Sequence, residues 1–173
     1  SLGVNLVVGD VTDPFTLGDL LASSTVYLDM THPKYYHHSI EVVGKAGIRS
    51  AFFITTTGLY SKYNDCSEIY KVGETRIKNS GVDYTIIRPS MIYGTERDRN
   101  MTRLLRYLSK WPVFPVFGDG LGLMQPVYVQ DLADGIVKIV SNPELTRGKE
   151  YNLCGPTAIS FTELIEIACE ALN

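Results

Sequence analysis

Four short polar segments follow apolar runs in the chain, and their residue types could bind a ligand. They are Gly9-Asp10-Val11, Asp29-Met30-Thr31-His32, Thr55-Thr56-Thr57-Gly58 and Arg88-Pro89-Ser90-Met91. Hydroxyl and carboxylate groups hydrogen-bond to ligands, and glycine lets a ligand approach the backbone closely. The same residue types favour plain turns, so each segment alone indicates a turn, whereas the ordered series indicates a binding edge.

The periodicity of the apolar residues places these segments at the ends of strands. It predicts strands over residues 4–8, 25–30, 50–57 and 84–92, and helices over 15–22, 33–46 and 66–79. Alternating strands and helices with short connections predict βαβ units and a parallel sheet. Ligands bind at the carboxyl ends of the strands in such a sheet, so the four segments should share one edge.

The pattern loosens in the last third of the chain. We expect Asp131 and Ser160 to be the N-caps of helices over 131–140 and 161–172, the second through the capping box Ser160-x-x-Glu163. A helix is also predicted over 99–110, a strand over 151–153, and a glycine-rich loop with a short strand over 112–122. Trp111 is expected to pack in the core or in the last third of the chain.

Composition excludes several classes of protein. The 173 residues carry a net charge of -3, so no basic surface for nucleic acid is indicated. No apolar run approaches the roughly 20 residues that cross a bilayer. The three cysteines show no metal-binding spacing, which is typical of a reducing, cytoplasmic protein. His37 and His38 have only Glu41 as a nearby further ligand, so we expect a surface cluster and no metal site.

Five segments together resemble the extended and atypical short-chain dehydrogenase/reductase family, which includes NAD-dependent epimerases and dehydratases. They are GVNLVVGDVTDPFTL (3–17), ITTTGLYS (54–61), DYTIIRPSMIYG (83–94), PVYVQDLADGIV (126–137) and KEYNLCGPTAISFTEL (149–164). The resemblance implies an α/β fold, a Rossmann-like doubly wound parallel sheet without its N-terminal βαβ portion. It divides the chain into a partial dinucleotide-binding core (1–95) and a small C-terminal substrate-side lobe (96–173). The family's G-x-x-G-x-x-G loop is not found, and the glycine cluster at 118–122 is interpreted as a loop.

The resemblance also implies a site for NAD or NADP. Asp10 and Val11 fall where the family meets the adenine ring, Thr56 where it has the active-site hydroxyl, and Lys71 where a lysine binds the nicotinamide ribose. The implied catalytic residues are Thr56 and Lys71, and the implied cofactor contacts are Asp10, Val11, Met30, Thr31, Thr55, Lys71, Pro89, Ser90 and Met91. The substrate would be a small molecule. A basic cluster (Arg97, Arg99, Arg103 and Arg106) favours a phosphate-bearing one or is simply a solvated helix face.

Two departures from the family pattern bear on function. Four residues before Lys71, where the family has its proton-transferring tyrosine, this chain has Ser67; Tyr63 and Tyr70 are the nearest phenols. The family's nucleotide-sugar enzymes carry an arginine where this chain has Met124-Gln125-Pro126, which weakens a nucleotide-sugar substrate. Lys71 also fits a solvated helix lysine, and Thr56 a strand-end hydroxyl without a role.

Three interpretations follow. The first is an NAD(P)-dependent epimerase, dehydratase or reductase, which the retained Lys71 and Thr56 favour. The second is a non-catalytic NAD(P)-binding regulatory or assembly protein, which the missing tyrosine favours. The third is a fragment that binds nothing by itself. A homo-oligomeric state is left open.

Overall fold

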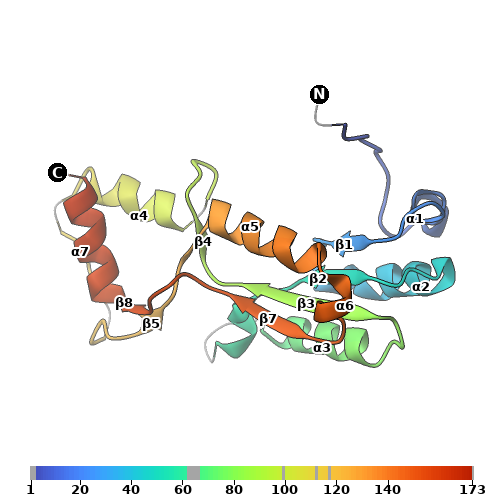
Figure 1. The fold of residues 1–173 in the computed structure, drawn as a ribbon. Coiled ribbons are helices and arrows are strands. Elements are labelled where there is room, and N and C mark those ends of the chain that lie inside the picture. The colour runs from blue at the N-terminus through green and yellow to red at the C-terminus, as the bar shows by residue number, and fades with distance from the viewer. Residues whose placement is uncertain (1–2, 62–66, 99, 112, 117, 173) are drawn as a thin grey trace. The chain divides into compact units, whose positions relative to one another are not determined.

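The computed structural model describes residues 3–61, 67–98, 100–111, 113–116 and 118–172 (Figure 1). The chain divides into two compact units. The first consists of Ser1–Arg88 and Ile139–Tyr151, and the second of Pro89–Lys138 and Asn152–Asn173.

A parallel sheet lies at the centre of the first unit. Strands β1 (Tyr27–Asp29), β2 (Ala51–Ile54) and β3 (Tyr84–Pro89) pair in parallel, and β7 (Glu150–Leu153) extends the sheet beside β3. Strands buried on both faces read as continuous apolar runs, as β2 and β3 do. The predicted α/β class with a parallel sheet is confirmed.

Helices cover one face of this sheet. They are α1 (Pro14–Leu21), α2 (Tyr36–Ala46) and α3 (Ser67–Lys78). The unit also contains the short 3-10 helices η1 (Pro33–Tyr35) and η2 (Thr57–Tyr60) and the short helix α6 (Pro143–Thr146). The main core cluster packs α2 and α3 against β2 and β3, for example Val43 and Ile77 with Phe53 and Ile86. Helix α2 ends at Gly47, whose φ of 66° is left-handed, as predicted.

The strand predicted over residues 4–8 is wrong. Residues 3–10 form no regular structure, and Leu6 and Val8 are 90% and 91% exposed. A strand needs a neighbour to complete its hydrogen-bonded ladder. Among the described residues no strand pairs with this segment, so its apolar composition alone does not make it one.

The second unit combines helices with short strand pairs. Strand β4 (Ile92–Tyr93) pairs in parallel with β6 (Val127–Tyr128), and β5 (Leu123–Met124) pairs antiparallel with β8 (Ile159–Ser160). The helices are α4 (Met101–Leu108), α5 (Val129–Val140) and α7 (Phe161–Ala171). Figure 1 shows α4 and α7 side by side, and contacts join them.

Three predictions for this unit have clear outcomes. The capping box is confirmed, because the Ser160 side chain accepts from Glu163 N at 3.1 Å and the Glu163 side chain accepts from Ser160 N at 2.6 Å. Asp131 is not an N-cap, because α5 begins two residues earlier and places Asp131 in its first turn. Trp111 does not pack in the interior but is largely exposed beyond the end of α4.

The glycine cluster at 118–122 is a loop against the start of α7. The carbonyl oxygens of Gly122 and Gly120 accept hydrogen bonds from Phe161 N (3.0 Å) and Thr162 N (3.2 Å). The first N–H groups of α7 are therefore occupied by the protein's own carbonyls and by the capping box. This geometry gives an anion no helix N-terminus to bind. The described helices include none long and apolar enough to cross a membrane.

Candidate functional site

The carboxyl ends of β1, β2 and β3 form one edge of the sheet, because these strands are parallel and in register. Met30 and Thr31 follow β1, Thr55 and Thr56 follow β2, and Pro89 ends β3. Three of the four polar segments are thus brought to one edge, as predicted. The fourth, with Asp10 and Val11, lies in the irregular segment before α1 and ends no strand.

A buried carboxylate, that of Asp29, holds the turn after β1 in place through hydrogen bonds. Asp29 is almost fully buried and accepts hydrogen bonds from the backbone and hydroxyl of Thr31, each at 2.7 Å, and from the Tyr27 hydroxyl at 3.2 Å. Burial and the nearby Asp29 charge raise the pKa of Tyr27 to about 12, so this phenol stays a donor. Met30 is left 65% exposed, an apolar side chain at the edge where a planar ligand could lie.

The two threonines after β2 point to different partners. The Thr55 hydroxyl is buried and donates to Glu74 Oε1 at 2.8 Å, so it supports the interior. The Thr56 hydroxyl caps η2 by accepting from Gly58 N at 3.0 Å. A hydroxyl that accepts one hydrogen bond still carries a proton to donate. Thr56 is therefore the hydroxyl of this pair that suits a ligand oxygen.

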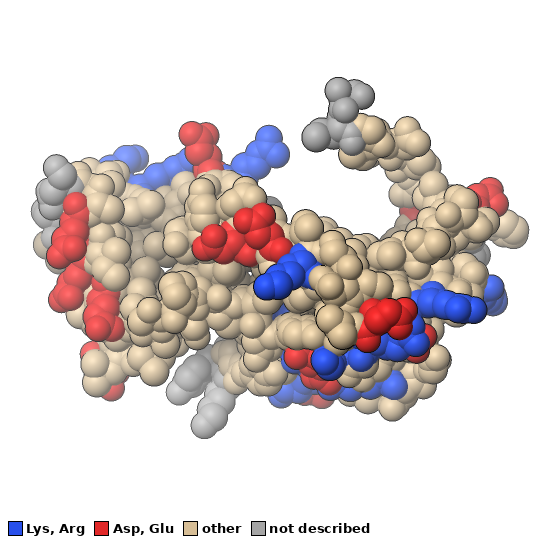
Figure 2. Space-filling model, viewed as in Figure 1, with Lys and Arg blue, Asp and Glu red and all other residues tan. Residues whose placement is uncertain are grey.

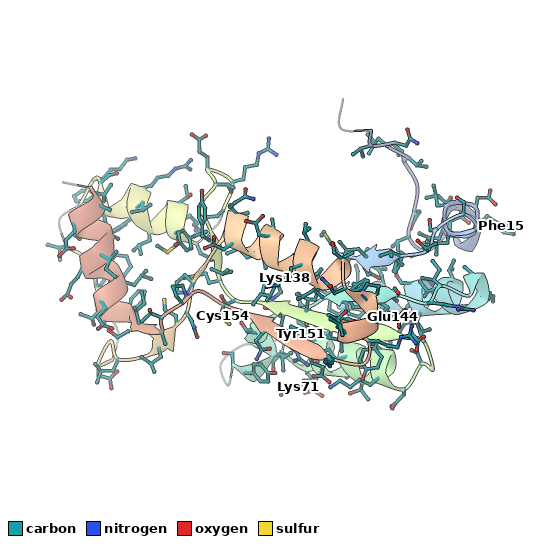
Figure 3. All side chains as sticks on the ribbon, viewed as in Figure 1. Phe15, Lys71, Lys138, Glu144, Tyr151 and Cys154 are labelled. Carbon is teal, nitrogen blue, oxygen red and sulfur yellow. The ribbon has the colours of Figure 1, made fainter. Side chains whose placement is uncertain are left out.

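Lys71 lies on α3 (Figure 3), with its side chain about half exposed. Its Nζ is 4.0 Å from Glu68 Oε2, at the limit of an ion pair, so the ammonium can turn to another acceptor. Ser67, one helical turn earlier, lies on the same side of α3. The ring of Tyr70 instead lies 6.1 Å from that of His32, while Tyr63 is outside the described residues. A short hydroxyl, rather than a phenol, stands one turn before the lysine.

An ion-pair network, buried at Arg88 and Glu74, joins α3 to the sheet. Arg88 of β3 binds both carboxylate oxygens of Glu74, at 2.7 and 2.5 Å, and its guanidinium also binds Glu150 of β7. Glu150 in turn pairs with Lys78 of α3 at 2.6 Å. Hydrogen bonds from Arg88 to Glu74 and Glu150 raise the pKa of the guanidinium despite its burial. Glu74 lies one turn after Lys71, so the network fixes the part of α3 that carries the lysine.

Sequence reasoning missed this network, although one signal was present. Arg88 lies in an apolar strand, and a charged residue in such a strand needs a buried counter-charge. Glu74 lies 14 residues before Arg88 in the chain, on α3. Glu150 lies 62 residues away in sequence, and only the pairing of β3 with β7 brings it near.

Asp10 is occupied by its own turn. Its carboxylate accepts from the backbone N and the hydroxyl of Thr12, each at 2.8 Å, and these hydrogen bonds lower the pKa of this exposed group. Val11 is half-buried beside it. The expected role of both residues at an adenine ring stays a prediction.

The remaining predicted site residues belong to the second unit. The Ser90 hydroxyl donates to the Gln125 carbonyl at 2.5 Å, and Ser90 N donates to Leu153 O at 3.0 Å, so Ser90 is held inside that unit. Met91 lines a cavity of about 440 Å³. Arg97, Arg103 and Arg106 are exposed, and Arg99 is outside the described residues.

No grouping of three or more His, Cys, Asp or Glu side chains suits a metal ion within the described ranges. The rings of His37 and His38 lie 3.8 Å apart on α2, and Glu41 binds Lys45 at 2.6 Å.

A model of the NAD dependent epimerase/dehydratase family matches residues 68–154, half of the chain. The chain belongs to this family. The match covers Lys71, the Arg88 network and both sides of the β3–β7 pair. It confirms the family resemblance and makes NAD the cofactor class to which the fold is suited.

Comparisons with individual proteins agree with this assignment. The chain is 36% identical over 100 residues (58% of this chain) to subunit 9 of the NADH dehydrogenase [ubiquinone] 1 alpha subcomplex from Arabidopsis thaliana mitochondria, and spans 25% of that protein. Its structure resembles a nucleoside-diphosphate-sugar epimerase from Staphylococcus aureus, with a TM-score of 0.74, 22% identity, and coverage of 94% of this chain and 58% of the other. It also resembles the enzyme WbmG from Bordetella bronchiseptica, solved with NAD, with a TM-score of 0.78, 14% identity, and coverage of 100% and 64%. At these identities the two structures establish the fold alone.

The described edge fits part of a dinucleotide. Met30 after β1 offers an exposed apolar face, Thr56 after β2 offers a hydroxyl proton, and Lys71 on α3 offers an ammonium 4.0 Å from the Glu68 carboxylate. These groups suit a base or ribose ring and its hydroxyls. Among the described residues no glycine-rich turn opens a helix after a strand, so the groups present fit the sugar and base parts better than the pyrophosphate.

Proposed function

We propose that this chain is the partial core of an NAD-binding protein that serves as a non-catalytic subunit of a larger assembly. The observation that carries the proposal is Ser67 on α3, one turn before Lys71, where acid–base catalysis in this fold needs a phenol. A serine hydroxyl is a much weaker acid than a phenol and is shorter by a ring. Proton transfer to a substrate oxygen therefore has no donor at this position.

The remaining residues suit binding without chemistry. Lys71 would donate to the ribose hydroxyls, Thr56 would donate to an oxygen of the ligand, and Met30 would pack against a ring. When bound, NAD supplies hydride transfer chemistry, and without a proton donor that capacity would be unused. A bound dinucleotide would then stabilise the fold or report on cellular redox state.

Similarity to a subunit of a multi-protein complex supports an assembly role. The Arabidopsis relative is described as a subunit, and it shares more identity with this chain than the two solved structures do. We infer a protein partner of this kind. The relative is described as mitochondrial, so the expectation of a cytoplasmic protein stays a prediction.

The second candidate is an epimerase or dehydratase that works with a different acid. Lys71 and Thr56 favour it, as does the fold shared with a nucleoside-diphosphate-sugar epimerase. In this candidate Thr56 would orient the substrate oxygen and another group would move the proton. The substrate would be a small molecule, with or without a phosphate group.

Titration of the intact protein with NADH, followed by nicotinamide fluorescence, tests the proposal. We expect saturable binding that Lys71→Ala weakens about tenfold, because a hydrogen bond from a charged donor contributes roughly 1.5–3 kcal/mol. Lys45→Ala is the matched control, because Lys45 forms an exposed pair on α2, and it should bind NADH as the parent does. The absence of saturable binding would refute the proposal. NADPH in a parallel titration decides between the two cofactors.

Turnover separates the two candidates. If the protein is non-catalytic, adding a nucleotide sugar or a small carbonyl substrate leaves the absorbance of NADH and the product composition unchanged. Turnover that disappears in Lys71→Ala, with the fold intact by circular dichroism, would instead establish the enzyme.

A further inference from the structure

An open hollow of about 440 Å³ lies within the second unit, and three methionines are among the residues that line it. Met91, Met101 and Met124 line it, which are three of the chain's four methionines. Methionine is unbranched and polarizable, and it adapts to ligands of varied shape. The volume falls in the range of pockets that bind small molecules.

Aromatic and leucine side chains complete the apolar wall. Tyr107 of α4 packs edge-on against Phe114 with ring centroids 5.2 Å apart, and Phe114 packs against Phe161 of α7 at 5.8 Å. Leu104 and Leu164 lie on the facing helices α4 and α7. Edge-to-face packing is a favourable arrangement of aromatic rings, so these contacts stabilise this side of the hollow.

The cavity has one charged group. Arg103 of α4 lines it, and no ion pair of Arg103 is found within the described part of the chain. The other polar atoms among the described lining residues are the Asn100 amide and the Tyr107 hydroxyl. Figure 2 shows basic side chains along the edge of α4. An open apolar hollow with a guanidinium at its edge complements a molecule that is apolar at one end and anionic at the other.

Space continues beside this cavity. Met101 and Leu164 also line two neighbouring hollows of about 620 and 240 Å³. Small side-chain movements at these two residues would lengthen the chamber for an extended occupant. A nucleoside diphosphate fits less well, because its two phosphates and sugar hydroxyls need several donors and the chamber offers one cation.

We propose that this cavity binds a single-chain amphiphile, with the apolar chain among the three methionines and the anionic head group at Arg103. The proposal concerns the second unit and does not rest on NAD binding by the first. Either a free fatty acid or an alkyl phosphate would supply this chemistry.

Methionine-methyl NMR of the intact protein provides the test. With ¹³C-methyl-labelled methionine, dodecanoate should shift the signals of Met91, Met101 and Met124 in a saturable way. Met30 lies in the first unit and is an internal control that should not shift. Dodecyl phosphate in a second titration distinguishes the two head groups, and UDP-glucose in a third tests the nucleotide alternative. The proposal is overturned if dodecanoate leaves the three signals unmoved, or if UDP-glucose alone moves them.

Two arginine variants locate the head group. Arg103→Gln should weaken dodecanoate binding about tenfold and leave binding of uncharged decanol unchanged. Arg106→Gln is the matched control, because Arg106 is on the same helix but lines the neighbouring 620 Å³ hollow. Equal loss in both variants, or loss in Arg106→Gln alone, would overturn the assignment of the head group to Arg103. An unchanged circular dichroism spectrum confirms that each variant is folded.

Discussion

At the scale of single residues, Arg88 is the residue whose replacement should lower the stability of the fold most. Arg88→Met leaves the buried carboxylate of Glu74 without its counter-charge. Breaking a buried ion pair in this way lowers the free energy of unfolding by about 3–5 kcal/mol. Urea unfolding measures the loss. Lys45→Ala breaks an exposed pair and should change the free energy of unfolding by less than about 0.5 kcal/mol.

The double variant Glu74→Gln with Arg88→Met tests the cause. It leaves no charge of this pair unpaired, so it should be more stable than Arg88→Met alone. A double variant that is as unstable as the single one would show that lost packing, and not a stranded charge, accounts for the cost.

Glu150 of the same network should make the stability of the fold depend on pH. Burial raises the pKa of this carboxyl, but hydrogen bonds from Lys78 and Arg88 outweigh burial and lower the pKa below its ordinary value. A carboxyl whose pKa is lower when folded stabilises the protein fully above the unfolded value of about 4.3. That stabilisation is lost as pH falls through the folded pKa.

We therefore expect the free energy of unfolding to fall with acidification below about pH 4.5, and to fall less steeply in Glu150→Gln. Glu144→Gln is the control, because Glu144 is exposed and 3.5 Å from Arg147 (Figure 3), and its slope should match the parent's. Urea titrations at a series of pH values measure both slopes. Identical slopes in Glu150→Gln and the parent would contradict the role of Glu150.

At the scale of elements, the start of α7 depends on its capping box. Ser160→Ala removes the acceptor of Glu163 N and frees the Glu163 carboxylate, which should destabilise the protein by about 1 kcal/mol. Ser109→Ala is matched in chemistry, but its hydroxyl donates to a carbonyl of its own helix end, so its effect should be smaller. Thermal unfolding of the two variants measures the difference. Equal decreases in Tm would contradict the stabilising role of the capping box.

Local chemistry explains which elements could be predicted from the sequence. Gly47 ended a helix and Ser160 began one because each acts through hydrogen bonds within a few residues. The segment 4–8 was predicted wrongly because a strand depends on a partner that composition does not reveal. Asp131 was assigned to the N-cap although α5 begins two residues earlier, since an acidic residue in the first turn and an N-cap look alike in sequence.

The residues of the candidate site likewise fall into those that could be predicted from the sequence and those that could not. Thr31, Thr56 and Pro89 could be placed on one edge, because parallel strands align their carboxyl ends. The inward turn of the Thr55 hydroxyl and the contact between Arg88 and Glu150 could not, because both depend on packing between distant segments. The methionine-lined cavity was equally hidden, since Met91, Met101 and Met124 come together only through the fold.

At the scale of the whole molecule, β1 presents an open strand edge. Among the described residues β1 pairs only with β2, so its other side has unpaired backbone groups. Such edges pair with further chains, and the exposed apolar residues of segment 4–8 add to this tendency. We expect the isolated 173-residue chain to self-associate with rising concentration.

Leu28→Pro tests whether that edge carries the association. Tyr27 N donates to Ser50 O on the β2 side at 3.0 Å, and successive N–H groups of a strand point to opposite sides, so the N–H of Leu28 points to the open edge. Proline removes that donor without removing a bond to β2. Leu28→Ala is the control, because it shortens the same side chain but keeps the N–H. Sedimentation velocity should show weaker association for Leu28→Pro than for Leu28→Ala, and equal association of the two would locate the contact elsewhere than at this edge.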